Sequence, residues 1–494
     1  MSGRKSRTIS ILLISLFLGA LLTLAFSPFN IYSLAFISPA ILLFIWLRSS
    51  PQQALWTGLL FGLGFFGTGA SWIYISIHRY GNASVSLAAF ITFLFVLFLA
   101  CYPATLGYLF RKFFSRTSML KQCLFIFPAL WVTWEYLRSV LFTGFPWLLI
   151  GYAQSTTPLQ GLAPIIGVYG LSLITVIISG ALVLLATRQT GTIKTIALLL
   201  IFGLIGLGWA FKNHAWTKPI GKPIKASLIQ GDIPQTIKWD QSYIVQNINV
   251  YKNLTLTHFS SQLIVWPEGA FPLYAQDAPQ FIRLLGKVAK KNHSNIIFGV
   301  PILNTKTQQY YNGLLLIGDN HGEYLKRHLV PFGEYIPLQP IFKKAMRDFK
   351  IPMSGFSEGP SNQPDLKINK IRIAPFICYE IAFPNEVLDS AEHSELLITL
   401  SDDSWFGRSI ALSQHLQMAE MRSLETGRYQ LLSTNTGITA FISPFGKILQ
   451  GAPIDKRMVI TDNVQPMTNK TPLMVWHYYP VVGAVILMVL MTLI

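Results

Sequence analysis

The stretch Ile-Arg-Ile-Ala-Pro-Phe-Ile-Cys-Tyr-Glu, residues 371–380, guides the interpretation of the whole sequence. Its first seven residues are mostly apolar and β-branched, which is typical of a buried strand. The expected strand ends at Cys378, and a carboxylate follows at Glu380. The other two cysteines, Cys101 and Cys123, lie in long apolar stretches, where a thiol is usually a small hydrophobic side chain. We therefore expect Cys378 to take part in chemistry.

Similar strands are expected throughout residues 212–471, where Asp, Glu, Lys, Asn and Pro are frequent. Apolar runs alternate there with two stretches of helical spacing, 280–290 and 415–426. Runs that are apolar throughout are typical of strands covered on both faces, so this region is expected to be a layered α/β domain. The expected strands are Ile224 to Ile229, Leu263 to Trp266, Asn295 to Val300, Leu314 to Ile317, Ile371 to Cys378 and Leu396 to Leu400.

The composition of the whole chain is that of a membrane protein. Of its 494 residues, 51% are hydrophobic and 12% are charged, which is too apolar for an ordinary soluble protein. Several uncharged runs approach the ~20 residues that a spanning helix needs. A further run, 122–140, carries Glu135 and Arg138, which can neutralise each other on one helix face. The uncharged runs are 8–26, 30–47, 53–77, 84–110, 162–187, 195–211 and 474–494.

Basic residues indicate the orientation of these runs. They fall on one side of a membrane only if 122–140 is counted, which gives about eight spans. By the positive-inside rule that side is cytoplasmic and holds both termini, with Arg79 as the clear exception. The domain at 212–471 then faces the periplasm of a two-membrane bacterium. The basic residues are Arg4, Lys5, Arg7, Arg48, Arg111, Lys112, Arg116, Lys121, Arg188 and Lys194.

Reactive side chains lie beside the ends of apolar runs in the 212–471 region. Glu268 follows Leu-Ile-Val-Trp-Pro and precedes Gly269, which permits a sharp turn. Lys326 lies in Tyr-Leu-Lys-Arg-His-Leu-Val-Pro-Phe-Gly-Glu, residues 324–334. Because ligand sites form at strand ends in α/β sheets, these two side chains and Cys378 are expected to meet in one cleft.

The three residue types suit acyl transfer through a thioester. A neighbouring Lys cation lowers a thiol pKa from about 8.5 toward the attacking thiolate. A carboxylate can take the thiol proton and later deprotonate the second nucleophile. Lys326, with the backbone N–H of Tyr379, can stabilise an oxyanion.

These motifs resemble the Glu-Lys-Cys triad of the nitrilase superfamily. With the apolar runs around them, nearly the whole chain resembles the apolipoprotein N-acyltransferase family, the inner-membrane enzymes that complete bacterial lipoprotein maturation. The resemblance also rests on Thr-Gly-Phe-Pro-Trp (143–147), Gln-Gly-Asp-Ile-Pro-Gln (230–235) with Lys238-Trp239, and Asp403-Ser404-Trp405-Phe406-Gly407.

The fold implied by this resemblance has two parts. A polytopic α-helical membrane domain of about eight spans occupies residues 1–211 and ends with a transmembrane helix at 472–494. A nitrilase-like αββα sandwich occupies residues 212–471. The Asp402-Asp403 pair departs from the Asn-Asp type of pair expected in the family, so the detail of that loop is open.

The resemblance also assigns roles to residues of this sequence. Glu268 is the expected general base, Lys326 the oxyanion stabiliser and Cys378 the nucleophile. Supporting roles fall to Glu334, Tyr379 and Glu380. The expected substrate-binding residues are Trp239, Trp147, Trp405 and Phe406.

Each residue taken alone has a simpler interpretation. An isolated buried Cys is usually inert, and a lone Lys at a strand end is usually solvated. Glu334 and Glu380 could instead hold Lys326 or a backbone turn. Trp239, Trp405 and Phe406 could be ordinary aromatics beside a membrane. For His328 and His415 a structural hydrogen bond is favoured, and no metal-ligand spacing surrounds them.

The expected activity follows from the family. An acyl chain moves from a phosphatidylethanolamine-like phospholipid to Cys378, and then to the N-terminal S-diacylglyceryl cysteine of an apolipoprotein. No cofactor or metal ion is expected, the enzyme is expected to be a monomer, and the net charge of +17 gives no indication of nucleic acid binding. The alternatives are a membrane-tethered nitrilase-like amidase or hydrolase that uses water, and a transporter with an appended binding domain.

Overall fold

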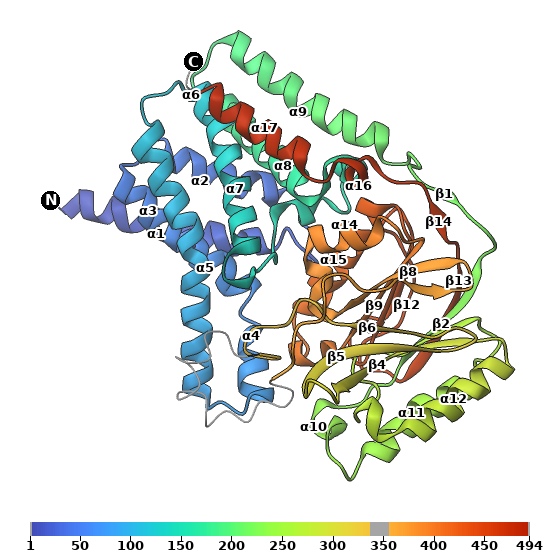
Figure 1. Ribbon diagram of the computed structural model, residues 1–494. Helices are drawn as coiled ribbons and strands as arrows, with labels where there is room; N and C mark the ends of the chain where they lie inside the picture. The colour runs from blue at the N-terminus through green and yellow to red at the C-terminus, as the bar shows by residue number, and fades with distance from the viewer. Residues whose placement is uncertain (1, 336–354, 493–494) are drawn as a thin grey trace. The chain divides into compact units, whose positions relative to one another are not determined.

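The computed structural model describes residues 2–335 and 355–492 (Figure 1). The chain divides into two compact units. The first unit comprises Met1–Tyr74, Val85–His214 and Val475–Ile494, and the second comprises Ile75–Ser84 and Ala215–Met474. Residues 75–84, which lie within the predicted membrane domain at 1–211, are grouped with the second unit. Residues 493 and 494 of the expected last span lie outside the described residues.

Helices make up the regular structure of the first unit. Each of the expected apolar runs, 122–140 included, contains one. Their bounds are α1 Ser2–Thr23, α2 Leu34–Trp46, α3 Pro51–Gly69, α5 Val85–Phe114, α6 Met119–Lys121, α7 Phe127–Val140, α8 Ala163–Ala186, α9 Gly191–Phe211 and α17 Tyr479–Leu490. The short α4, Ile73–Ile75, spans the boundary between the units.

Helix length does not confirm the expected count of eight spans. Within the described residues, three helices are long and apolar enough to cross a membrane: Val85–Phe114, Pro158–Ala186 and Gly191–Phe211. A fourth is reached if Pro51–Gly69 and Ile73–Tyr80, bent by 58°, form one broken span. Three further apolar helical segments, Thr8–Thr23, Leu34–Trp46 and Tyr479–Leu490, have 10–17 residues each.

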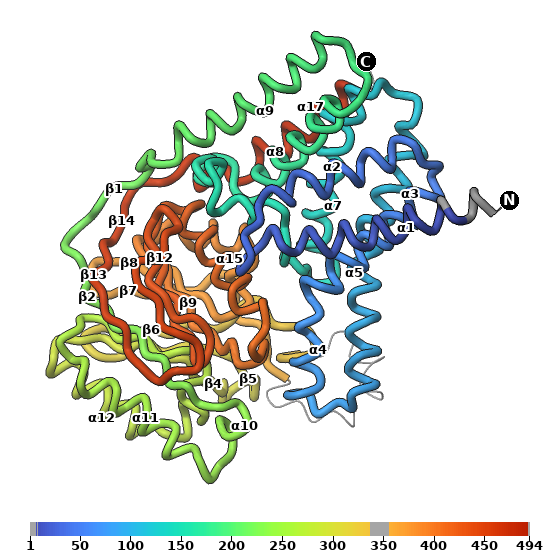
Figure 2. Tube along the Cα trace, turned by 180° about the vertical axis from the view of Figure 1, so that it is seen from behind, coloured from blue at the N-terminus to red at the C-terminus, as the bar shows by residue number. Residues whose placement is uncertain are grey.

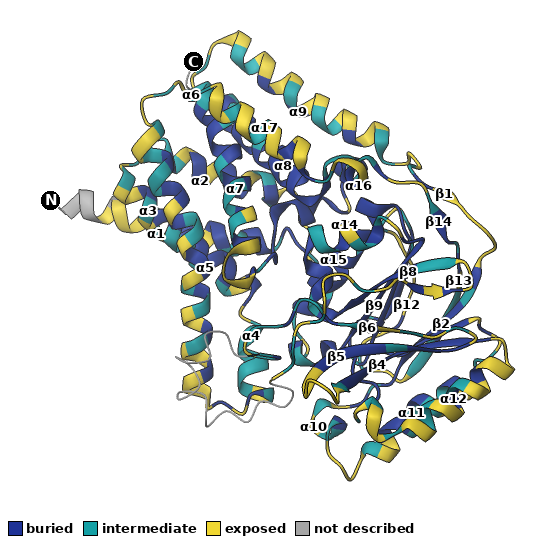
Figure 3. Ribbon diagram, viewed as in Figure 1, coloured by how far each residue is buried: buried dark blue, intermediate teal, exposed yellow. Residues whose placement is uncertain are grey.

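Close helix packing in the first unit depends on glycine. A Cβ added at Gly19 of α1 would lie 1.9 Å from the carbonyl oxygen of Phe61 in α3, and one at Gly64 of α3 would lie 2.0 Å from that of Leu16. Small residues at such contacts let backbones approach, as in membrane helix pairs. In contrast, α9 exposes large apolar side chains along its length (Figure 3). Phe202, for example, is 69% exposed.

The described part of the second unit contains two six-stranded sheets (Figures 1 and 2). In spatial order, one sheet contains β13 Met458–Val464, β2 Ile224–Gln230, β3 Leu263–Val265, β4 Asn295–Asn304, β5 Gln309–Gly318 and β6 Gly322–Leu325. The other contains β12 Ile448–Gly451, β11 Ala440–Ile442, β10 Gln430–Thr434, β9 Leu396–Ser401, β8 Ile371–Ile377 and β7 Leu366–Ile368. A small antiparallel pair joins β1 Lys218–Pro219 to β14 Met467–Thr468.

The two sheets pack face to face, with helices on both outer faces. Buried side chains of alternate residues, such as Ile224, Ala226 and Leu228 of β2 and Leu396 and Ile398 of β9, form one core between the sheets. On one side α11 Ile244–Leu256 and α12 Pro279–Lys291 cover the β2–β5 sheet, and on the other α14 Pro384–Ala391 and α15 Ala411–Thr426 cover β8 and β10. Both faces of each sheet are therefore covered, as the continuously apolar strands predicted.

Parallel pairing brings the reactive segments to corresponding strand ends. β3 lies between β2 and β4 and is parallel to both, and β9 lies in the same way between β8 and β10. Glu268 follows β3, Cys378 follows β8, and Asp402 follows β9. The sandwich thus presents the carboxyl ends of parallel strands from both sheets to one region.

Candidate active site

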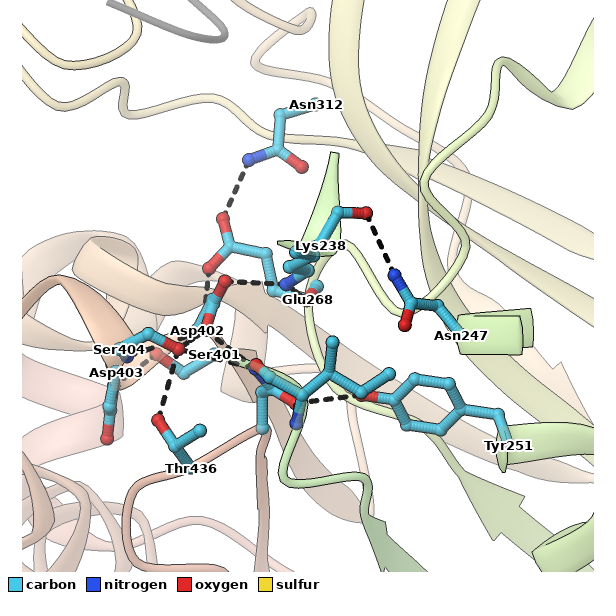
Figure 4. A network of polar contacts seen from close by, with 12 residues as sticks. Lys238, Asn247, Tyr251, Glu268, Asn312, Ser401, Asp402, Asp403, Ser404 and Thr436 are labelled. Carbon is cyan, nitrogen blue, oxygen red and sulfur yellow. Dashed lines mark hydrogen bonds and ion pairs between the residues drawn. The ribbon is translucent and has the colours of Figure 1, made fainter. Parts of the chain in front are cut away.

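Glu268 is held by hydrogen bonds on both carboxylate oxygens. Its Oε1 accepts from the side-chain amide of Asn312 at 2.7 Å, and its Oε2 accepts from the backbone N–H of Asp402 at 2.9 Å (Figure 4). Burial raises the pKa of Glu268, and the ammonium of Lys326, 3.6 Å from Oε1, opposes that rise without cancelling it. A carboxylate with a raised pKa is a stronger base when ionised, which suits proton removal from a thiol.

Lys326 lies between two carboxylates. Its Nζ donates to Glu334 at 2.9 Å, and it is 1% exposed. Burial alone would lower the pKa of Lys326, but Glu334 and Glu268 outweigh it and hold that pKa above its usual range. The Asn312 amide also donates to Glu334 at 2.7 Å, so it joins the two carboxylates. Lys326 is therefore a permanent, fixed cation.

Cys378 occupies a strained turn immediately after β8. Its φ is +53°, a left-handed conformation that costs a non-glycine residue roughly 1–2 kcal/mol. Burial raises the pKa of the Cys378 thiol well above its usual range, and Glu268 raises it further against the lowering by Lys326. The expected lowering of the thiol pKa by Lys326 is present but is outweighed, because burial and Glu268 raise that pKa more strongly. The resting thiol is protonated and needs a base.

Glu380 links the nucleophile turn to the segment that follows Lys326. It is fully buried, and its Oε2 accepts from the backbone N–H of Ile377 at 2.6 Å. Its Oε1 accepts from the hydroxyl of Tyr324 at 2.9 Å and the backbone N–H of Arg327 at 2.7 Å. Glu380 therefore fixes residues adjacent to Cys378 and to Lys326.

Glu334 and Tyr379 differ in their surroundings. Besides Lys326, the Glu334 carboxylate accepts from the backbone N–H of Val330 at 2.8 Å, which closes the loop between the two residues. The ring of Tyr379 is only partly buried and contacts the rings of His328 and Phe383. Its side chain is thus available at the surface of the turn.

Three of the expected substrate-binding aromatics lie in the second unit. Trp239 is partly buried, and its ring lies so close to Gly269 that a Cβ there would be 3.3 Å from Cζ2. Trp405 is also partly buried; its carbonyl accepts from Ser76 at 2.7 Å and its ring contacts Tyr80 at 5.4 Å.

The two other expected aromatics are buried. Phe406 is 9% exposed and its ring lies 6.1 Å from that of His415. Trp147 belongs to the first unit, where it is 1% exposed and contacts the rings of Trp72 and Phe145. In the structure as it stands, Trp239 and Trp405 are therefore the more accessible members of the expected set.

Four polar residues near the site were not assigned a role from the sequence: Asn312, Lys238, Asp402 and Asp403. Asn312 is the one strongly polar side chain in the apolar part of β5, Asn-Gly-Leu-Leu-Leu-Ile, and that exception could have identified it. The ion pair between Lys238 and Asp402, at 2.5 Å, has no local sequence signal because the partners are far apart in the chain. Among the described residues, no group of three or more His, Cys, Asp or Glu side chains could hold a metal ion.

Comparisons with known proteins match both units. Residues 18–181 match the family model of the apolipoprotein N-acyltransferase N-terminal domain, and residues 225–472 match that of the carbon-nitrogen hydrolases. The apolipoprotein N-acyltransferase of Coxiella burnetii is 49% identical over 97% of this chain and 99% of its own. The apolipoprotein N-acyltransferase of Azotobacter vinelandii is 41% identical over 96% of this chain and 93% of its own.

Solved structures align with about half of the chain. Saccharomyces cerevisiae Nit3, a member of branch 10 of the nitrilase superfamily, aligns over 50% of this chain and 92% of its own, with 19% identity and a TM-score of 0.37. A carbon-nitrogen hydrolase from Helicobacter pylori G27 aligns over 49% of this chain and 89% of its own, with 14% identity and a TM-score of 0.38.

Proposed function

This chain belongs to the apolipoprotein N-acyltransferase family, and on that basis we propose how it acts. It transfers a fatty acyl chain from a phospholipid to the N-terminal S-diacylglyceryl cysteine of an apolipoprotein, through a thioester on Cys378. The observation that carries this proposal is the arrangement of Glu268, Lys326 and Glu334 around a buried, protonated thiol.

In the first half-reaction, Glu268 takes the proton from Cys378 as the sulfur attacks the ester carbonyl of the phospholipid. The carbonyl oxygen becomes an oxyanion, which Lys326 and the backbone N–H of Tyr379 stabilise. The ester C–O bond then breaks, Glu268 returns the proton to the departing oxygen, and a lysophospholipid leaves. The raised pKa of Glu268 supports both directions of this proton transfer.

In the second half-reaction, the α-amine of the diacylglyceryl cysteine attacks the thioester. Glu268 takes a proton from the amine as the amide bond forms, and that proton passes to the departing Cys378 sulfur. The same groups thus serve both steps, and the thiol is regenerated. Partly buried aromatics such as Trp239 and Trp405 would contact the lipid parts of the two substrates.

The location proposed for this chemistry is the outer face of a bacterial inner membrane. We infer a multi-pass protein of about eight spans with both termini in the cytoplasm and residues 212–471 in the periplasm. Support comes from the distribution of basic residues and from the exposed apolar side chains of α9. A chain of this kind meets both lipid substrates without extracting them from the bilayer.

Mass spectrometry of the purified protein tests the proposal. After incubation with phosphatidylethanolamine in detergent micelles, a fatty acyl group is expected on Cys378. Adding a diacylated lipopeptide should discharge it as a triacylated product. Cys378→Ala should form no acyl-enzyme, whereas Cys101→Ala, which removes an exposed thiol of the first unit, should behave as wild type.

Two outcomes would contradict this function. Acylation that persists in Cys378→Ala would remove the nucleophile from the scheme. Release of free fatty acid at the same rate with and without lipopeptide would instead indicate the hydrolase alternative, in which water attacks the thioester.

A further inference from the structure

Two consecutive buried aspartates follow β9 and point in different directions. Asp402 and Asp403 are 4% and 1% exposed. Figure 4 shows the carboxylate of Asp402 directed toward Lys238 and Glu268, and that of Asp403 directed away from them. Neither is used by the proposed reaction, and an Asn was expected at position 402. Each therefore requires its own explanation.

Asp402 and Lys238 hold Glu268 at both its side chain and its backbone. The Asp402 N–H donates to Oε2 of Glu268, and the Asp402 carboxylate pairs with Nζ of Lys238 at 2.5 Å. That same Nζ donates to the backbone carbonyl of Glu268 at 2.9 Å. The other oxygen of Asp402 accepts from Ser404 and Asn435, so the carboxylate is itself fixed.

Asp403 acts on the other side, through His415. Its Oδ1 lies 3.2 Å from Nδ1 of His415, and Nε2 of that ring lies 3.3 Å from the backbone carbonyl of Cys378. Both ring nitrogens face oxygens that only accept, an arrangement that favours the protonated ring. Burial lowers the pKa of His415, but Asp403 and the backbone carbonyl of Cys378 raise it above its usual value. His415 thus links Asp403 to the left-handed Cys378 turn.

We propose that Asp402 and Asp403 are positioning residues that set the base and the nucleophile relative to each other. Asp402, with Lys238, fixes Glu268; Asp403, with His415, fixes the Cys378 turn. Because the two aspartates are adjacent in the segment that follows β9, they link the placement of two groups that come from different sheets. This inference rests on the proposed roles of Glu268 and Cys378.

Buried ion pairs can also be purely structural, and the two explanations differ in measurable ways. Removing Lys238 leaves the Asp402 charge uncompensated beside Glu268, which already faces Glu334 and Lys326. The pKa of Glu268 should then rise further, so a higher pH is needed to ionise the base. A structural pair would change thermal stability only, with the pH profile of the folded enzyme unchanged.

The experiment measures alkylation of Cys378 by iodoacetamide across pH, resolved by peptide mass spectrometry, alongside acyl-enzyme formation from phosphatidylethanolamine. Lys238→Met should move the acid limb of both profiles to higher pH, with roughly tenfold slower reaction at neutral pH. Adding Asp402→Asn to that variant should return the limb toward its wild-type position. If Lys238→Met does not fold, Asp402→Asn alone should move the limb to lower pH, because a like charge near Glu268 is lost.

His415→Gln tests the other arm. It removes the ring that links Asp403 to the Cys378 turn, and both reactions should slow about 100-fold through misplacement of the turn. His293→Gln and Asp240→Asn, exposed positions of the same unit, serve as matched controls and should leave rates and profiles unchanged.

Unchanged alkylation profiles in Lys238→Met and His415→Gln, with lowered melting temperatures, would overturn the inference. If wild type alkylates as expected yet forms no acyl-enzyme, the proposed function fails while the positioning roles stand.

Discussion

Both units of this protein bury charges, but they use them differently. In the first unit, Glu135 and Arg138 of α7 are 6% and 4% exposed. The Arg138 guanidinium donates to the backbone carbonyls of Phe145 and Trp147, and the Glu135 carboxylate accepts from the backbone N–H of Ile150 at 2.8 Å. One cation and one anion therefore hold the chain that follows α7.

The second unit buries a cluster in which negative groups outnumber positive ones, called here the unbalanced set. One ammonium, Lys326, faces the two carboxylates Glu268 and Glu334, and a thiol lies beside them. Burial, and the Glu334 charge with it, raises the pKa of Glu268 although Lys326 lowers it, so this carboxylate accepts a proton more readily than an exposed one. A balanced pair stabilises backbone, whereas an unbalanced cluster can move a proton. Charge balance thus separates a structural device from a catalytic one.

The largest effect is expected from Glu268→Gln, which removes the proton acceptor from the unbalanced set. Acylation of Cys378 should fall by about 10²–10⁴-fold, the usual contribution of a general base. The free energy of unfolding should change little, because the set loses an excess negative charge. Time-resolved mass spectrometry and thermal unfolding measure the two quantities. Glu358→Gln, exposed in the same unit, is the control; a Glu268→Gln variant that acylates at the wild-type rate would refute the base.

The balanced pair should respond in the opposite way. Arg138→Met removes the donor to the backbone carbonyls of Phe145 and Trp147. The free energy of unfolding should fall by about 3–5 kcal/mol, because each of two hydrogen bonds to a charged group contributes about 1.5–3 kcal/mol. The pH profile of acylation by the remaining folded enzyme should not move. Denaturation in detergent and the pH profile test this together. Adding Glu135→Gln should recover part of the stability, and a shifted profile in Arg138→Met would contradict the distinction.

Glu380→Gln should have an intermediate effect, since Glu380 positions the site from outside the unbalanced set. Its charged oxygens accept hydrogen bonds from Ile377, Arg327 and Tyr324, and the loss of charge should cost about 1.5–3 kcal/mol of stability. Acylation should slow at every pH. The low-pH side of its pH–rate profile should not shift, because the ionisation of Glu268 still sets it. Equal acylation rates in the folded variant would show that the backbone turn holds without Glu380.

The sequence predicted the strands better than the spans, for a physical reason. Strands covered on both faces are continuously apolar, and β2, β3, β4, β5, β8 and β9 were found where such runs occur. Helix ends in the apolar runs depend on local turns instead. The grouping of residues 75–84 with the second unit has no periodic signal in the sequence.

The candidate site was predictable where its residues share a motif. Lys326 and Glu334 lie eight residues apart and pair directly, so one motif contains both. The contacts of Asn312 and of the Lys238–Asp402 pair depend on the approach of segments from different parts of the chain. Net effects on pKa are equally non-local. The lowering of the Cys378 pKa by Lys326 was predicted from the sequence, but the larger rise caused by burial could be seen only in the packed structure.

The smallest effect is expected at Gly269, which joins the unbalanced set to the Lys238–Trp239 segment. Its φ is +57°, and a Cβ would lie 3.1 Å from Nζ of Lys238. Gly269→Ala should therefore cost the roughly 1–2 kcal/mol of left-handed strain plus a further loss from crowding. Gly221→Ala is the matched control, because its φ is +64° and nothing lies within 4 Å of its Cβ. The free energy of unfolding is measured for both variants, and the extra loss in Gly269→Ala is the cost of crowding Lys238. Equal losses would mean that Lys238 can move aside without cost.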